Sequence, residues 1–221
     1  MTSAGRARSR QAAAADAIGA LMVTRAQGRG GVAGRLALEG VRLIEVDSAP
    51  TRRIADGIGG ANAGDVASRL ASDVICGCCL HPPPSRDDPS QARLLAESAV
   101  KDANAAILAH ARDNPGCASL RTTVVVGYLG NRWPTYAHVG DSRLYRLRDE
   151  RLQQLTSDHS MIQELVDQGF FQDLEQARQN GINEHILTHA LGSGTDLLAP
   201  PTAVSELAAG DIFLFCTDGV T

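Results

Sequence analysis

Four short strand-like segments between residues 122 and 155 constrain the fold of this chain more than any other feature. They are Thr122–Leu129, Trp133–Val139, Arg143–Leu147 and Leu152–Leu155. Each is rich in β-branched, aromatic or other apolar residues, and the turns between them are too short to contain a crossover helix. The pattern therefore predicts an antiparallel meander and excludes a βαβ unit.

Two helices are predicted before these strands. After Asn62, apolar residues recur at every fourth position from Val66 to Cys78, which is typical of a helix with one buried stripe. Gln91–Ala111 is rich in alanine and leucine and carries its charges on another face, so it predicts a second helix. The proline-rich HPPPSRDDPS segment between them predicts a loop.

Residues 160–190 return to a helical pattern, with one short amphipathic helix ending near Phe170 and another over Asp173–Asn180. The remaining strand candidates are Val41–Val46, Thr51–Ala55, Thr202–Leu207 and Asp211–Cys216. Strands and helices occur in separate runs, so the expected fold class is α+β.

Residues 1–40 differ from the rest of the chain. They are rich in arginine, alanine and glycine and show no sustained period, which predicts disorder or at most a loose helix near Gln11–Leu21. Such a composition also arises when a GC-rich coding region is read from a wrong start or frame. The expected organisation is this N-terminal segment followed by one domain over residues 41–221.

Composition narrows the function classes. Aromatic residues make up 4% of the chain and the formal net charge is −4, so neither a stacking surface nor a basic field for nucleic acid is expected. No apolar run reaches the length of a membrane span, and no signal peptide is evident, so we expect no membrane association. Five cysteines, three of them within Cys76–Cys79, argue against a disulfide framework and favour a cytoplasmic location.

Three aspartates share one local design, in which an apolar strand ends and an aspartate next to a glycine follows. They are Asp56, Asp141 and Asp218. Any one of them is well explained as an ordinary turn residue. Gathered at one sheet edge, their carboxylates would instead form an oxygen-rich pocket suited to Mg²⁺ or Mn²⁺.

The order of the motifs resembles that of the metal-dependent protein phosphatases, the PPM or type 2C family. The matching segments are ADGIGGANAGDVAS, SLRTTVVVGYL, AHVGDSRLYRLRDERLQQLTSDHS, HILTHALG and FLFCTDGVT. They span Ile54–Thr221 and are most similar to the compact bacterial members that carry a helical flap. The resemblance implies an αββα sandwich of two antiparallel sheets flanked by helices, with the flap over about residues 156–192.

The same resemblance implies the chemistry and the partners. In this family two divalent ions, Mg²⁺ or Mn²⁺ and in some members a third, sit at one edge of the sandwich. A hydroxide that bridges two of them attacks phosphoserine or phosphothreonine. The expected partner is therefore a phosphorylated protein, a target of a serine/threonine kinase, and the enzyme is expected to be a monomer.

Residue by residue, Asp56 matches the aspartate that bridges both ions, and Gly57 matches the glycine whose carbonyl reaches one of them. Asp218 matches a second aspartate ligand, and Asp141 matches a position tied to the third metal. Asp56 and Asp218 are therefore the catalytic candidates. Arg42 is spaced like the family's phosphate-binding arginine.

Two departures from the family pattern leave an alternative open. Val46 stands where the family's metal-binding glutamate of an Asn-Glu-Asp motif is expected, and the later Asp-Asn motif does not occur before Thr221. The domain is thus expected to be incomplete at both ends. A catalytically impaired pseudophosphatase or truncated product, acting only as a phosphoprotein- or kinase-binding module, is the alternative function.

The remaining histidines and cysteines have simpler interpretations. We interpret His138 as a core or cross-strand residue and His159 as part of a helix cap. His185 and His189 are expected on the flap surface, because the glutamate of a zinc-binding HExxH motif is missing. The Cys76–Cys79 cluster lacks a second pair at zinc-ligand spacing and is expected to be structural.

Overall fold

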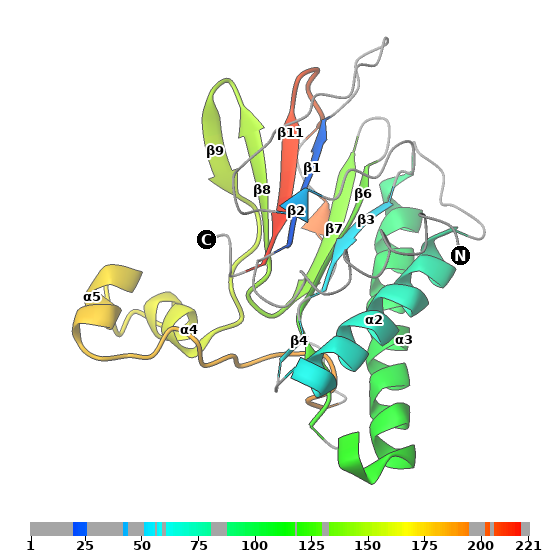
Figure 1. Ribbon diagram of the computed structural model, residues 1–221. Coiled ribbons are helices and arrows are strands. Elements are labelled where there is room, and N and C mark those ends of the chain that lie inside the picture. The colour runs from blue at the N-terminus through cyan, green and yellow to red at the C-terminus, as the bar shows by residue number, and fades with distance from the viewer. Residues whose placement is uncertain are drawn as a thin grey trace, which may run out of the picture.

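The computed structural model describes residues 20–25, 42–43, 51–55, 57–58, 61–80, 88–117, 119–129, 133–194, 202–203 and 206–217 (Figure 1). Its strands are β1 (Ala20–Arg25), β2 (Arg42–Leu43), β3 (Thr51–Ile54), β4 (Gly57–Ile58), β5 (Arg121–Thr122), β6 (Val124–Leu129), β7 (Pro134–Val139), β8 (Arg143–Arg148), β9 (Arg151–Gln154), β10 (Thr202–Ala203) and β11 (Ile212–Cys216). Its helices are α2 (Ala61–Leu80), α3 (Pro89–Asp113), α4 (Met161–Asp167) and α5 (Leu174–Gln179), with a 3₁₀ turn at Pro115–Cys117.

The strands form two stacked sheets and one short pair. One sheet has five strands in the order β2-β1-β11-β8-β9, and the other has four in the order β10-β7-β6-β3. All neighbours are antiparallel except β1 and β2, which are parallel. The expected α+β fold of two stacked, mainly antiparallel sheets is therefore confirmed.

Helices α2 and α3 lie together on the outer face of the four-stranded sheet (Figure 1). Asp88 caps α3 by accepting a hydrogen bond from the Ser90 amide at 2.9 Å, and Pro89 begins the helix. The buried stripe of α3 consists mostly of alanines, which let the helix backbone approach the sheet closely. This layer contributes one core, while Phe213, Phe215 and Leu144 belong to a second core together with Val125 and Tyr136.

The predicted meander is wrong at one turn. β6 pairs with β7 in the four-stranded sheet, but β8 pairs with β9 and β11 in the other sheet. The chain changes layers at Gly140, whose φ of +102° lies in the region that favours glycine. If β8 had continued beside β7 in the four-stranded sheet, β11 would lack its neighbour on that side in the other sheet.

The N-terminal expectation is also wrong in part. Disorder or a loose helix was expected within residues 1–40, but Ala20–Arg25 forms β1 and pairs with β11 from Leu21↔Cys216 to Arg25↔Ile212.

The predicted Thr202–Leu207 strand is shorter and forms β10 over Thr202–Ala203. The two flap helices are confirmed at Met161–Asp167 and Leu174–Gln179. No helix among the described residues has the length and apolarity needed to cross a membrane.

Candidate active site

The ends of five strands meet at one end of the sandwich, which we call the site edge. β3 ends at Ile54, which pairs with Val125 near the start of β6. Val139, the last residue of β7, pairs with Val124, the first residue of β6. In the other sheet, the last residue of β11, Cys216, pairs with Arg143, the first residue of β8. The segments that follow β3, β7 and β11, and those that precede β6 and β8, therefore all lie at this edge.

The predicted ligand positions are attached to these strand ends. Gly57 begins β4, and Asp141 is part of the turn between β7 and β8. Asp56 and Asp218 lie outside the described residues. In the sequence, Asp56 separates Ala55 from Gly57, and Asp218 follows Thr217 directly.

Arg42 reaches the same end of the molecule through its backbone. Arg42 is the first residue of β2 and pairs with Ala20, the first residue of β1. The next residue of β1, Leu21, pairs with Cys216 at the end of β11. The strand order places β2 two positions away from β11 in this sheet. The backbone register therefore brings the phosphate-binding candidate to the site edge.

Two facing glycines hold β4 against the first turns of α2. A Cβ atom added at Gly57 would lie 2.1 Å from the carbonyl carbon of Gly64, and one added at Gly64 would lie 2.6 Å from that of Gly57. Side-chain atoms do not approach backbone atoms this closely, so both positions require glycine. The glycines after Asp56 thus have a packing role that the sequence pattern did not reveal.

Buried hydroxyl groups hold the turn that contains Asp141. The Thr123 and Ser142 hydroxyl oxygens are 2.6 Å apart and both residues are buried. Thr122 exchanges backbone hydrogen bonds with Leu191, at 3.2 and 2.9 Å, and its side chain donates to the Thr123 carbonyl. The hydrogen bonds of Thr122 also tie residue 191, at the end of the flap, to the site edge.

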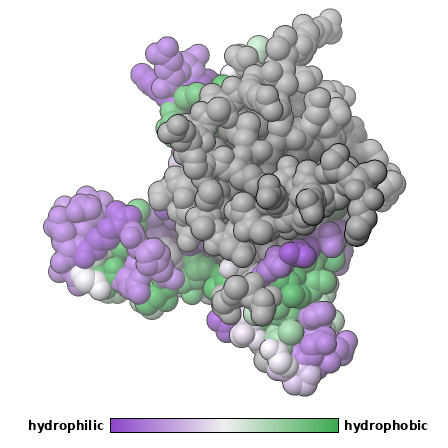
Figure 2. Space-filling view, viewed as in Figure 1, coloured by the Kyte–Doolittle hydropathy of each residue, from purple (hydrophilic) through white to green (hydrophobic). Residues whose placement is uncertain are grey.

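A partly buried ion pair ties down the other end of the flap. Arg143 donates to both carboxylate oxygens of Asp158, with Nε–O distances of 2.9 and 3.0 Å and an Nη2–Oδ2 distance of 2.6 Å. These hydrogen bonds raise the pKa of Arg143 above its ordinary value despite its partial burial. Between the two attachment points, at Asp158 and Leu191, α4 and α5 form a lobe that stands out from the body of the molecule and is mainly hydrophilic (Figures 1 and 2).

Three histidines pack together where the flap joins β7. The rings of His138 and His159 are stacked with centroids 4.5 Å apart, and His189 meets His159 edge-on at 5.2 Å. The Gly140 amide donates to Nδ1 of His159 at 3.2 Å, which requires a neutral acceptor nitrogen. The Asp-His-Ser segment that contains His159 does cap α4, and the capping side chain is that of Ser160, while the His159 ring packs among the histidines. His189 is also not a free surface residue, whereas His185 is exposed as expected.

This packing predicts a pH-dependent stability. Burial, followed by the proximity of His138 and His189, lowers the pKa of His159 to about 4 from 6.5. The unfolded chain therefore binds this proton first, so the contribution is complete above pH 6.5 and is lost as pH falls toward 4. We expect the free energy of unfolding of His159→Asn to vary less between pH 7 and pH 4, by about 2 kcal/mol after allowing for partial exposure.

Denaturant unfolding at several pH values measures this difference. His185→Asn is the matched control, because it removes an exposed histidine from the same flap. If His159→Asn and the unsubstituted protein keep parallel pH profiles, the histidine cluster does not titrate as described.

The donor set at the site edge consists of oxygen atoms. Gly57 supplies a backbone carbonyl and Asp141 a partly exposed carboxylate, which are the ligand types that Mg²⁺ and Mn²⁺ take. Within the described ranges, which omit Asp56 and Asp218, no group of three His, Cys, Asp or Glu side chains is placed to hold a metal ion.

Two stacked, mainly antiparallel sheets, with helices on one outer face and a helical flap, define an α+β sandwich (Figure 1). The family model described as Protein phosphatase 2C matches residues 45–221, and the chain belongs to this family. The serine/threonine protein phosphatase PstP of Mycobacterium tuberculosis is 35% identical over 171 residues. The alignment covers 76% of this chain and 31% of PstP, so the chain spans about a third of that relative.

Other comparisons agree. The serine/threonine phosphatase stp of Listeria monocytogenes is 31% identical over 185 residues, which cover 79% of this chain and 68% of stp. The crystal structure of the PstP catalytic domain in complex with two manganese ions has a TM-score of 0.66 and 29% identity, covering 92% of this chain and 78% of that one. PppA, a regulatory component of the type VI secretion system in Pseudomonas aeruginosa, has a TM-score of 0.63 and 27% identity, with 79% and 68% covered.

Proposed function

We propose that this chain is a metal-dependent serine/threonine protein phosphatase that hydrolyses phosphoserine and phosphothreonine in phosphorylated proteins. The observation that supports this most is the common site edge. Gly57 and Asp141 start from the same end of the sandwich, and chain connectivity attaches Asp56 and Asp218 to it. The 2C family match over residues 45–221 and the named phosphatase relatives support the same activity.

Asp56, the Gly57 carbonyl and Asp218 would hold two Mg²⁺ or Mn²⁺ ions, and Asp141 would serve a third. When bound, such ions lower the pKa of a coordinated water and neutralise charge on phosphoryl oxygens. The described residues of the chain would hold the ligand groups in position. The contact between Gly57 and Gly64 fixes the carbonyl donor, and the buried hydroxyl pair of Thr123 and Ser142 fixes the turn of Asp141.

Two further parts of the chain would act on the substrate. Arg42 would bind the phosphoryl group, since its backbone lies at the same sheet end as the last residue of β11. The flap, tied at Asp158 and Leu191, would border the entrance for a phosphorylated segment. Exposed apolar side chains on it, Met161, Phe170 and Ile186, are available for contact with residues around the phosphorylated one.

A metal-dependence assay tests the proposal. With Mn²⁺ the purified chain is expected to release inorganic phosphate from a phosphothreonine peptide, and chelation with EDTA is expected to reduce the rate by at least about 100-fold. Adding back Mn²⁺ or Mg²⁺ in excess of the chelator should restore it. Turnover that persists in EDTA would overturn the metal mechanism, and no turnover with any divalent ion would overturn the activity itself.

A further inference from the structure

Asn104 is a polar residue within the buried stripe of α3. The other buried residues of this helix are alanine, valine or isoleucine, whereas Asn104 carries an amide and is only 4% exposed. Its Oδ1 atom accepts a hydrogen bond from the Gly192 amide at 2.7 Å, and its Nδ2 atom donates to the Gly194 carbonyl at 2.8 Å. A buried amide group costs stability unless it is hydrogen-bonded, so these two contacts explain why the helix tolerates it. Asn104 therefore holds the segment in which the flap returns to the body of the molecule.

The backbone of this segment fits closely between α3 and the start of β5. Gly192 has a φ of +84°, and a Cβ atom added there would lie 2.1 Å from the Leu120 carbonyl oxygen and 2.8 Å from Cγ2 of Ile107. Only glycine fits such a position. The preceding residue, Leu191, is fully buried. Residues 191–194, which we call the return leg, are thus fixed by a close backbone contact and by the amide of the facing helix.

The return leg determines where the flap lies, because the two legs of the flap are paired. Ser160 and Leu187 form a β-bridge, and the Met161 amide donates to the Ile186 carbonyl at 2.8 Å. Met161 begins α4, and both Met161 and Ile186 are 41% exposed. A displacement of the return leg would therefore move these two apolar side chains and the start of α4 together.

The same leg lies beside the site edge without supporting the carbonyl donor alone. Thr122 pairs with Leu191 on one side and with Gly57 on the other. Gly57 is also held by its close contact with Gly64 of α2. Release of the return leg should therefore displace the flap and leave Gly57 in place.

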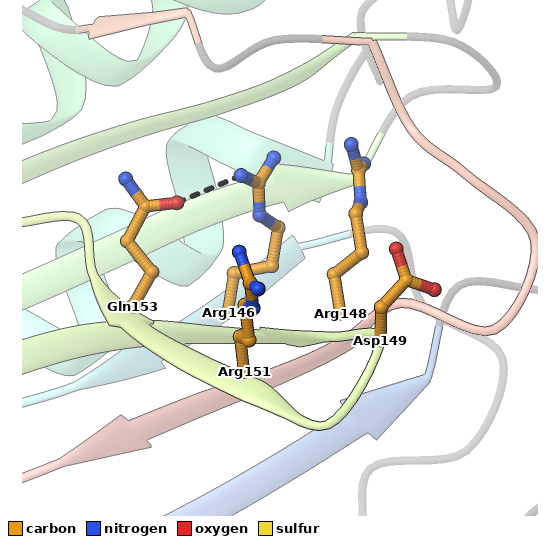
Figure 3. Close-up of a pocket in the computed structure, with 5 residues that line it drawn as sticks. All are labelled: Arg146, Arg148, Asp149, Arg151 and Gln153. Atoms are coloured by element: carbon orange, nitrogen blue, oxygen red, sulfur yellow. Dashed lines mark hydrogen bonds between the residues drawn. The ribbon is translucent and has the colours of Figure 1, made fainter.

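The β8–β9 hairpin lies at the opposite end of β8 from the site edge. Its concavity is lined by Arg146, Arg148, Asp149, Arg151 and Gln153. Arg146 donates to Gln153 (Figure 3), and Arg148 donates to both carboxylate oxygens of Asp211. These contacts hold the hairpin within the five-stranded sheet, whereas the flap lies beside the site edge.

We propose that Asn104 is a positioning residue for substrate recognition. By holding the return leg on α3, it sets the place of the flap beside the site edge, and with it the exposed side chains of Met161 and Ile186 that would contact residues around the phosphorylated one. Asn104 is buried, so it would act through the flap and not on the substrate itself. The inference rests on the proposed phosphatase function, which supplies the phosphorylated segment.

Amide hydrogen exchange, followed by NMR on the full chain without metal, tests the anchoring in the absence of turnover. In Asn104→Ala the Gly192 amide loses its acceptor and is expected to exchange at least about tenfold faster. Asn104→Asp keeps the shape and the acceptor but loses the donor to Gly194, so an intermediate rate is expected. The matched control is Ala96→Gly, about two turns earlier in α3, which weakens the same helix and leaves both hydrogen bonds in place. Its Gly192 exchange rate should stay within about twofold of the unsubstituted chain.

Steady-state kinetics with Mn²⁺ test the consequence for recognition. The KM of Asn104→Ala for a phosphothreonine peptide is expected to rise about fivefold while kcat stays within about twofold, because the flap would contact flanking residues and not the reacting atoms. p-Nitrophenyl phosphate has no flanking residues, so its kcat/KM should stay within about twofold. Ala96→Gly should leave the KM for both substrates unchanged.

The outcomes separate the two proposals. An unchanged Gly192 exchange rate in Asn104→Ala, or the same acceleration in Ala96→Gly, would overturn the anchoring. An unchanged KM for the peptide, or equal losses for the peptide and p-nitrophenyl phosphate, would overturn the role in recognition. If the unsubstituted chain releases no phosphate from either substrate, the phosphatase function fails, while the exchange rates still decide whether Asn104 fixes the flap.

Discussion

Replacing Asp56 with alanine is expected to lower kcat/KM for a phosphothreonine peptide in Mn²⁺ by about 1,000-fold or more. In the proposed site Asp56 would hold both divalent ions, so its loss would remove the metal-activated water and the charge neutralisation together. Asp56→Asn should be nearly as impaired, because the amide keeps the size of the side chain but loses its negative charge. Asp218→Ala should also lose activity through weaker metal binding, seen as a higher Mn²⁺ requirement.

Asp73→Ala is the matched control for these variants. Asp73 is an exposed aspartate on α2, away from the site edge, and its removal should leave kcat/KM within about twofold. Unfolding curves should show that all four variants are folded. If Asp56→Ala turned over the peptide as fast as Asp73→Ala, Asp56 would not be a metal bridge and the site would have to be sought elsewhere.

Gly64→Ala is expected to destabilise the protein by about 3 kcal/mol and to reduce phosphatase activity at the same time. The added Cβ would lie 2.6, 2.8 and 2.9 Å from the C, O and Cα atoms of Gly57. These are backbone atoms, so no side-chain rotation relieves the overlap, and β4 or the start of α2 must move. Because Gly57 follows Asp56, the same displacement moves the carbonyl donor that the proposed metal site uses.

Gly77→Ala makes the same substitution in the same helix with the opposite expected sign. A Cβ at Gly77 would have nothing within 4 Å, and alanine is the better helix former, so this variant should gain about 0.5–1 kcal/mol. Chemical denaturation of the two variants, with phosphate release as the second readout, checks the pair. A Gly64→Ala protein as stable and active as Gly77→Ala would show that the close contact between α2 and β4 does not constrain the site.

Local periodicity predicted most of the regular elements because each is stabilised by its own buried stripe. The four-residue spacing from Val66 to Cys78 falls within α2, and the predicted Gln91–Ala111 helix falls within α3. The β6–β7 and β8–β9 hairpins were predicted because their turns are short and their strands apolar. The family motifs likewise gave the α+β sandwich, since residues 45–221 match the family model.

β1 was missed because its pattern is not distinctive on its own. Ala20–Arg25 follows an alanine-rich segment, and its strand conformation depends on pairing with β11, nearly 200 residues later. The change of sheet at Gly140 was missed for a similar reason. A turn sequence shows that the chain reverses, but whether the next strand pairs with the previous one or passes to the facing sheet depends on which face must be buried.

The sequence by itself determined the helices, the hairpins, the family and the candidate ligands Asp56, Gly57, Asp141 and Asp218, because these depend on local spacing and on motif order. Only the tertiary structure decided which strand ends share an edge, that Gly57 and Gly64 touch, and that His159 stacks on His138. Each of these pairs residues from separate segments or follows from strand register. Such contacts are set by the packing of the whole chain, which no local pattern encodes.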